Sequence, residues 1–379
     1  MAVGTSRKIT AASARSHTRK SNRGGSAKSI SGIFSKVIVI LLVGLLAWGY
    51  KVIQPVQPKI CGSPGGPPIT APRIKLRDGR YLAYKEHGVP KDSAKVKLIY
   101  VHGFLSSRLS IVDLLPLEVA NELSVYALSF DRPGYGESDP HPERTLKSLA
   151  LDIEELADKL DLGSKFYLVG LSMGGGFSWG CIKYISHRLA GVSLLTPVTN
   201  YWWQGFPANV STPAFLKQSI SDQLALRVAH FTPWLTYWWN TQTIFPRSNV
   251  IAGDPCVFSS KDKEIVAKML SEKKDEVVAH REYALQQGEY ESIHRDLVIG
   301  FGKWEFDPLE LEKPFANKDV SVHVWQGDED LMVPVELQRY IAQKLPWIHY
   351  HELAGAGHLF IYSDGLPYQI LKTMLSNEL

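Results

Sequence analysis

The sequence predicts an α/β protein in which helices cover both faces of a mainly parallel central sheet, with an apolar helix placed before it. From residue 73 onward, short apolar runs of strand length alternate with amphipathic helical patterns. Strands connected through helices in this way pair in parallel by right-handed crossovers. Upstream of residue 73 the chain is first basic, then apolar, then rich in proline, so those residues are expected to lie outside the sheet.

Residues 1–36 are predicted to be a disordered basic arm. They are rich in Ser, Gly, Arg and Lys, and residues 1–77 carry 13 basic residues and no acidic one. Such a segment buries too little apolar surface to offset the entropy lost on ordering. The rest of the chain carries 29 basic and 38 acidic residues, and this acidic balance argues against binding of nucleic acid.

Residues 37–51 are interpreted as a transmembrane signal-anchor. The apolar run extends from Val37 to Tyr50, and counting from Ile33 gives 18 residues, or about 27 Å of helix. A cleaved signal peptide has a shorter basic region and an A-x-A-like site, and no clear site follows here. An organellar transit peptide fits the arm but not the apolar run. We therefore expect a single-pass protein of the endoplasmic reticulum or another endomembrane, with organelle import as the alternative.

Residues 52–72 predict a stiff, extended linker, because they contain six prolines. Residues 73–87 then predict a β-hairpin with Asp78-Gly79 as its two-residue turn. The chain has three cysteines and no CxxC pair, a pattern that indicates neither a disulfide scaffold nor structural zinc.

The main body, residues 73–379, continues as alternating strands and helices. Strands are predicted at residues 97–101, 125–130, 166–169, 192–195, 320–325 and 348–353, and helices at 145–160, 173–185 and 334–345. In the first of these helices, apolar residues recur at three- and four-residue steps, which places them on one face. These residues are Leu146, Leu149, Ile153, Leu156 and Leu160.

Ser172 is the predicted nucleophile. It lies in the sequence Gly170-Leu-Ser-Met-Gly174, between a predicted strand and a predicted helix. This G-x-S-x-G pattern in a strand–turn–helix setting indicates a nucleophile elbow, a sharp turn that lifts the serine hydroxyl out of the sheet. Such a turn has almost no room for side chains two residues before and after the serine, and both positions are glycine. The N-terminus of the following helix favours developing negative charge.

Asp330 is the predicted acid. The loop after the strand at residues 320–325 contains three carboxylates, those of Asp328, Glu329 and Asp330. Asp330 directly precedes an apolar Leu-Met-Val-Pro run and is best placed to turn inward. The loop that follows residue 195 contains no carboxylate, which strengthens the choice of Asp330.

His358 is the predicted base. It follows the strand at residues 348–353 in the stretch Ala-Gly-Ala-Gly-His, whose small residues allow a short loop to reach over the sheet toward Ser172. The resulting chain order of Ser172, Asp330 and His358 is the order found in hydrolases with this elbow.

In this architecture two backbone N–H groups bind the oxyanion of a tetrahedral intermediate. Here they are expected to be those of Phe104 and Met173. Phe104 follows His102-Gly103 at the end of a predicted strand, and His102 is interpreted as a hydrogen-bonded structural residue.

On these residues, the chain resembles the α/β-hydrolase superfamily of the serine-nucleophile type from Arg73 to the C-terminus. The stretch Asp131-Arg-Pro-Gly-Tyr-Gly-Glu-Ser138 resembles the structural D-x-x-G-x-G-x-S loop of that family. A serine at position 172 instead of aspartate, and the lack of a proline after His102-Gly103, disfavour epoxide ring opening. The arm, the insertion and its tryptophans further resemble membrane-anchored plant α/β-hydrolase-like proteins.

The resemblance implies that residues from about 200 to 315 form a helical cap over the active site. Three interpretations of its aromatic residues stay open: they line an apolar acyl or terpenoid pocket, contact a membrane interface, or form the packing core of the cap. The segment contains five of the ten tryptophans, namely Trp202, Trp203, Trp234, Trp238 and Trp239.

The expected function is that of a serine hydrolase which cleaves an ester, thioester or lipid acyl bond through an acyl-enzyme, on a small apolar acyl or lipid-like substrate. No metal or organic cofactor is required. Two alternatives remain: the same triad used for C–C hydrolysis, lyase or acyl-transfer chemistry, and a non-hydrolysing small-molecule receptor.

Overall fold

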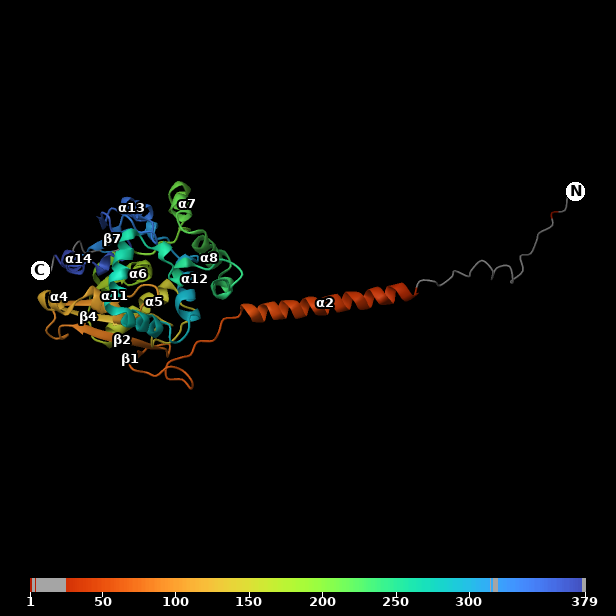
Figure 1. The fold of residues 1–379 in the computed structure, drawn as a ribbon, viewed down its shortest axis with the longest axis horizontal. Helices are drawn as coiled ribbons and strands as arrows, with labels where there is room; N and C mark the ends of the chain where they lie inside the picture. Colours follow the sequence, from red (N-terminus) through yellow and green to blue (C-terminus); the bar gives the residue numbers. More distant parts are fainter. Residues whose placement is uncertain (2–3, 5–24, 314, 316–319, 377–379) are drawn as a thin grey trace. The chain divides into compact units, whose positions relative to one another are not determined.

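The computed structural model describes residues 1, 4, 25–313, 315 and 320–376 (Figure 1). The chain divides into two units, Met1–Gln54 and Pro55–Leu379. Residues 5–24, which make up most of the predicted arm, lie outside the described residues.

The first unit contains helix α2, Gly25–Ile53. Its segment Gly32–Ile53 is apolar and has 22 residues, which corresponds to about 33 Å and is long enough to cross a membrane. Residues 25–36, predicted to belong to the disordered arm, continue the helix of the apolar segment, and no proline interrupts the chain before Pro55. The helix ends two residues before that proline, as steric exclusion of the helical conformation before proline requires.

The segment predicted as an extended linker folds back onto the main body. The Lys59 N–H donates to the carbonyl of Gln287 at 2.9 Å, and Cys61 is buried. Further along, the backbone N–H groups of Thr70 and Ala71 donate to the carboxylate of Glu137 at 2.7 and 3.0 Å. Part of the predicted linker is therefore hydrogen-bonded to the body through its backbone groups. Proline density alone could not reveal those partners.

The body contains an eight-stranded sheet in the order β1-β2-β4-β3-β5-β6-β7-β8. β1 pairs with β2 and β2 with β4 in antiparallel fashion, and all the other pairs are parallel. The six strands predicted after the hairpin are present, and seven of their twelve ends coincide with the prediction, while the other five differ by one to three residues. The bounds are β1 (Arg73–Lys75), β2 (Tyr81–Gly88), β3 (Val96–Val101), β4 (Val125–Phe130), β5 (Phe166–Leu171), β6 (Leu189–Leu195), β7 (Val322–Gly327) and β8 (Ile348–Leu353).

Two buried clusters cover the two faces of this sheet. Side chains alternate along β3, so that Ile99 and Val101 belong to one cluster and Leu98 and Tyr100 to the other. The first face packs against α5 (Leu146–Lys159), α6 (Met173–Tyr184) and α13 (Val335–Lys344). The second packs against α3 (Ile111–Leu114), α4 (Leu117–Glu122) and α14 (Leu366–Met374). Parallel strands buried on both faces in this way confirm the predicted α/β class.

Between β6 and β7 the described chain is helical and irregular. The α-helices of this segment are α7 (Ala208–Leu216), α8 (Ile220–Phe231), α9 (Thr236–Thr241), α10 (Asn249–Ala252), α11 (Ser260–Ala284) and α12 (Arg295–Phe301). α8 and α12 contact each other and lie side by side (Figure 1).

The aromatic residues of this segment differ in their surroundings. Trp203 is buried and stacks on Phe206, as packing of the segment's own core requires. Tyr201 and Phe301 line a cavity described below. Trp234 has 65% of its surface exposed. No single interpretation covers the whole set.

Candidate active site

Ser172 lies in the tight turn between β5 and α6, with φ +52° and ψ −116°. A positive φ is strained for a residue with a side chain, and such strain concentrates at functional sites. A Cβ at position 170 would lie 2.5 Å from Ser178 Oγ, and one at position 174 would lie 2.3 Å from the Val101 carbonyl oxygen. Glycine at both positions is therefore a steric requirement of the turn, as the sequence pattern predicts.

The structure brings the three predicted triad residues into one hydrogen-bonded series. His358 Nε2 lies 2.9 Å from Ser172 Oγ, and His358 Nδ1 lies 2.8 Å from Asp330 Oδ2. The three groups come from the loops after β5, β7 and β8, at the carboxyl edge of the parallel sheet. With Nδ1 donating to the carboxylate, Nε2 is free to accept the serine proton, which is the arrangement a general base needs.

Asp330 is held by its own loop. Its Oδ1 accepts the backbone N–H groups of Met332 and Val333, both at 2.9 Å, and its Oδ2 accepts Gln326 Nε2 at 3.0 Å. Its side chain has no exposed surface. By contrast, Asp328 is half-buried and accepts the backbone N–H of Gly355 in the loop after β8, whereas the imidazole of His358 is bound by Asp330.

Asp262 is a further residue of the site that the sequence reasoning missed. It lies in the first turn of α11, and its two carboxylate oxygens accept the backbone N–H groups of His358 at 3.0 Å and Leu359 at 2.7 Å. A Cβ at position 357 would lie 2.2 Å from the same carboxylate, so glycine is needed there for the close approach. The segment between β6 and β7 thus fixes the loop that carries the histidine.

The pKa of His358 lies above its ordinary value. Burial lowers it, but the Asp330 carboxylate, the hydrogen bond to it and the charge of Asp262 together outweigh burial. The two carboxylates therefore favour the imidazolium, the form that His358 takes once it has accepted the serine proton.

Phe104 and Met173 line the same cavity as Ser172 and His358. Met173 is the first residue of α6, so its N–H has no partner within the helix. In the described part of the chain neither of these two backbone N–H groups has a hydrogen-bond partner. Both are therefore available to an oxyanion formed beside Ser172.

The cavity has a volume of about 280 Å³ and a predominantly apolar lining. Apolar side chains come from the loop after β3, from α8 and α12, and from the loops near Asp330 and His358. The charged residues in the lining are Asp222 and Arg281, together with His358 when it is protonated. Asp222 is buried and accepts hydrogen bonds from the hydroxyl groups of Ser219 and Ser248, which occupy its carboxylate oxygens.

His102 has the structural role predicted for it. It is fully buried, its Nε2 accepts the Arg132 N–H at 3.0 Å, and its Nδ1 lies 2.9 Å from the Gly103 carbonyl. Burial and the neighbouring Arg132 charge hold its pKa well below the ordinary value. His102 therefore stays neutral and fixes the loop that carries Phe104.

Arg132 belongs to a buried ion network that joins the loop after β4 to α12. Arg132 and Arg144 both contact the carboxylate of Asp296, and Tyr135 donates to it at 2.6 Å. All four side chains are buried. Within the described residues, no three His, Cys, Asp or Glu side chains are grouped so that they could hold a metal ion.

The comparisons with known proteins agree with this fold. Residues 98–366 match the model of the alpha/beta hydrolase family. Among curated proteins, the chain is similar to the uncharacterized hydrolase YugF of Bacillus subtilis, with 23% identity over 74% of this chain and 89% of that protein. It is also similar to protein ABHD14A of Rattus norvegicus, with 25% identity over 50% of this chain and 77% of that protein.

Solved structures with the same fold include two esterases. A thermophilic esterase from Thermogutta terrifontis matches with a TM-score of 0.53 and 20% identity, over 82% of this chain and 99% of its own. A putative aryl esterase from Burkholderia cenocepacia matches with a TM-score of 0.56 and 17% identity, over 82% and 99%. The sheet order, the elbow and these matches define an α/β hydrolase fold. The chain belongs to the alpha/beta hydrolase family.

Proposed function

We propose that the protein is a serine hydrolase that cleaves an ester, thioester or lipid acyl bond of a small, apolar, uncharged substrate through an acyl-enzyme. The observation that carries this proposal is the hydrogen-bonded series from Ser172 through His358 to Asp330 at the wall of an apolar cavity. An apolar lining with few polar groups suits a hydrocarbon-like acyl chain.

The reaction follows from the positions of these groups. Ser172 Oγ attacks the acyl carbon while His358 Nε2 takes its proton, and the N–H groups of Phe104 and Met173 receive the developing oxyanion. His358 then returns the proton to the leaving oxygen or sulfur, and the alcohol or thiol departs. Water repeats the sequence on the acyl-enzyme and releases the acid. Asp330 holds the imidazole in the required tautomer throughout.

The membrane is the proposed location of this activity. The support is α2, whose segment Gly32–Ile53 is long and apolar enough to act as a single-pass anchor. We infer a signal-anchor in the endoplasmic reticulum or another endomembrane, with the body acting on lipid-like molecules near the bilayer.

A fluorophosphonate probe tests the proposal, because it reacts with a serine only when an aligned base and an oxyanion site are both present. We expect covalent labelling at Ser172, no labelling in Ser172→Ala, and labelling slowed by several powers of ten in His358→Ala. A series of p-nitrophenyl esters of increasing chain length would then define the acyl group. A folded protein that is neither labelled nor active on any ester would refute the proposal.

A further inference from the structure

The outer side of the segment between β6 and β7 exposes large apolar side chains next to one another. We define the exposed apolar surface by its most exposed members, which are Leu216 (57% exposed), Ile220 (74%), Phe231 (62%), Trp234 (65%), Ile244 (79%) and Phe245 (48%). All six lie within 30 consecutive residues of the chain. Single exposed apolar residues are common, but a group of this size marks an interaction site.

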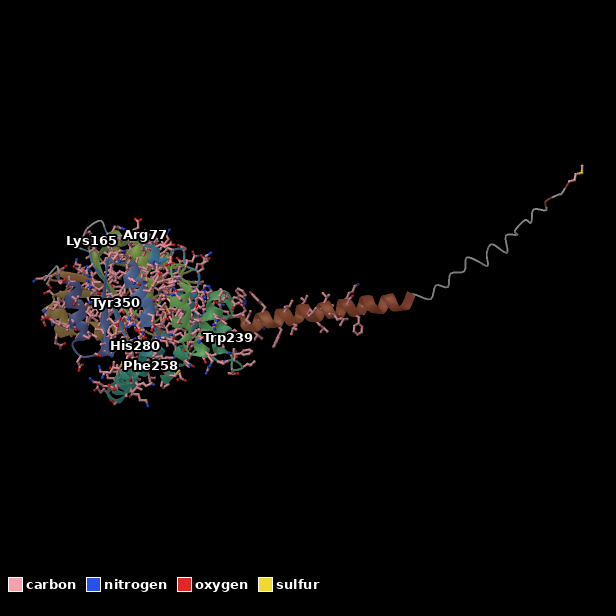
Figure 2. The ribbon with its side chains drawn as sticks, turned by 90° about the horizontal axis from the view of Figure 1, so that it is seen from above. Arg77, Lys165, Trp239, Phe258, His280 and Tyr350 are labelled. Carbon is pink, nitrogen blue, oxygen red and sulfur yellow. The ribbon has the colours of Figure 1, made fainter. Side chains whose placement is uncertain are left out.

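The geometry of α8 places Ile220 and Phe231 on the same face of the helix. Ile220, Leu224 and Phe231 recur at helical spacing on the side opposite Asp222 and Leu226, which line the catalytic cavity. α8 packs against the turn that contains Trp234 and against α9. Phe245 stacks on Trp239 of α9, with a centroid distance of 5.4 Å, and Trp239 lies toward the outside of the body in Figure 2.

A layer of partly buried rings supports the exposed side chains. Phe231 packs edge-on against Trp202 and His230, and these two rings stack on each other at 4.2 Å. The exposed ring of Phe231 is therefore held in place by two neighbouring rings, and that of Phe245 by Trp239. A fixed outward orientation of Trp and Phe rings is typical of side chains that enter a membrane interface.

The charges around this surface fit an anionic bilayer. Between residues 200 and 253 the only acidic residue is Asp222, which is buried. Arg227 and Arg247 are exposed, and within the described residues neither forms an ion pair. Residues 200–253 therefore combine exposed aromatic and aliphatic side chains with basic groups, while Lys217, beside Leu216, pairs with the partly exposed Glu336 of α13. Apolar and basic groups combined in this way are typical of a surface that lies on a membrane.

We propose that the exposed apolar surface docks on the surface of a lipid bilayer that contains anionic lipid. The connection to α2 supports this occupant. Only five residues, Gln54 to Pro58, separate the end of α2 from Lys59, which is hydrogen-bonded to the body. Five residues reach at most about 18 Å, so a body attached to a membrane-spanning α2 stays at the membrane surface. Because α2 already holds the body at the bilayer, docking of the exposed apolar surface is an intramolecular step and costs little further translational entropy.

Spin-label accessibility tests the docking with the full chain in vesicles of phosphatidylcholine and phosphatidylglycerol. Nitroxide labels are attached at Ile220→Cys and Trp234→Cys in a Cys256→Ser background, because Cys256 is the exposed native cysteine whereas Cys61 and Cys181 are buried. Leu151→Cys, on α5, is the matched control because it is also apolar and exposed. We expect labels 220 and 234 to collide more with oxygen than with a water-soluble nickel complex, and label 151 to show the reverse.

Charge variants add a second readout. Arg227→Glu combined with Arg247→Glu should reduce the oxygen preference at labels 220 and 234 in vesicles with anionic lipid, and change it little in phosphatidylcholine alone. Water-like accessibility at both labels, or failure of the protein to float with the vesicles, would overturn the proposal. If labels at position 234 on two molecules show spin–spin coupling and collide little with either oxygen or the nickel complex, a second copy of the chain covers the surface and the proposal is wrong.

Discussion

Asp262 connects the long helical segment to the catalytic loop through two hydrogen bonds to backbone N–H groups, those of His358 and Leu359. It also accepts hydrogen bonds from Ser259 at the start of α11, where the two residues form a capping box. The carboxylate of Asp262 therefore stabilises the start of α11 and also fixes the position of His358. Its charge also contributes to the raised pKa of His358.

We predict that Asp262→Asn shifts the acid limb of the kcat/KM pH profile to lower pH. His358 must be neutral to accept the serine proton, so activity rises with pH as the imidazolium loses its proton. Removal of a nearby negative charge destabilises the imidazolium and lowers the pKa of His358, which moves the limb downward. Ester hydrolysis measured between pH 5 and 8 checks this shift.

Ser259→Ala is the control, since it removes the helix cap and leaves the Asp262 charge in place. It should reduce the free energy of unfolding by about 1 kcal/mol and leave the pH limb unchanged. An equal shift of the limb in both variants would show that Asp262 acts only through the stability of α11.

Among the carboxylates after β7, Asp330 contacts the imidazole of His358, whereas Asp328 contacts the backbone of Gly355. Asp330→Asn should lower the rate of fluorophosphonate labelling on the order of 10⁴-fold, because the imidazole loses the partner that fixes its tautomer. Asp328→Asn should label at a rate near that of the wild type, because Asp328 contacts Gly355 and not His358. The opposite ranking would place the catalytic acid at position 328.

At the scale of elements, the buried network around Asp296 fixes α12 to the loop after β4 and to Arg144, just before α5. Asp296→Asn leaves Arg132 and Arg144 with uncompensated charge in the interior. Loss of one partner from a buried ion pair costs about 3–5 kcal/mol, and we expect a decrease of this order in the free energy of unfolding. Denaturant unfolding measures the decrease.

Glu352→Gln provides the comparison for that experiment. Glu352 pairs with Arg339 on the surface, where the side chain of the arginine is 51% exposed. Surface pairs contribute little, so the unfolding midpoint should change only slightly. If the two variants behave alike, the Asp296 network does not hold the elements together.

Most of the elements could be predicted from the sequence, because strand and helix periodicities are local signals. The candidate triad could also be predicted from the sequence. Each of its residues follows a parallel strand, and the carboxyl ends of such strands meet at one edge of the sheet. The role of Asp262 could not be predicted in this way. The stretch Ser259-Ser-Lys-Asp262 matches a capping box and indicates a helix start, but no local pattern shows which loop that helix start contacts. The packing of residues 59–71 on the body was missed for the same reason.

At the scale of the whole molecule, three buried histidines make stability depend on pH. Burial lowers the pKa of His294 to about 4. Burial, together with the adjacent His351 and His349, lowers the pKa of His323 to about 4. The pKa of His102 also lies well below its ordinary value. The unfolded chain therefore binds more protons than the folded protein below the ordinary histidine pKa of about 6.5. Stability contributed by these groups is present above that pH and is lost as the pH falls toward 4.

We predict that the melting temperature decreases between pH 7 and pH 5, and that His323→Gln makes this decrease smaller. His323 is the chosen position because it contacts His351 and Ser321 at 2.9 Å on the β7–β8 edge, away from the triad. A slope in His323→Gln equal to that of the wild type would show that this histidine is protonated in the folded state.

The contact between Asp262 and the histidine loop also limits how this protein can be engineered. Exchange of the segment between β6 and β7 for that of a relative is an attractive route to new substrate ranges, because the sheet is left untouched. Here such a transplant would remove the acceptor for two N–H groups beside the base and leave Gly357 facing an empty space. A transplanted segment would have to supply a carboxylate at the start of its own helix, in the position that Asp262 occupies beside the histidine loop. Chimeras should therefore be chosen on that contact first and on the pocket lining second.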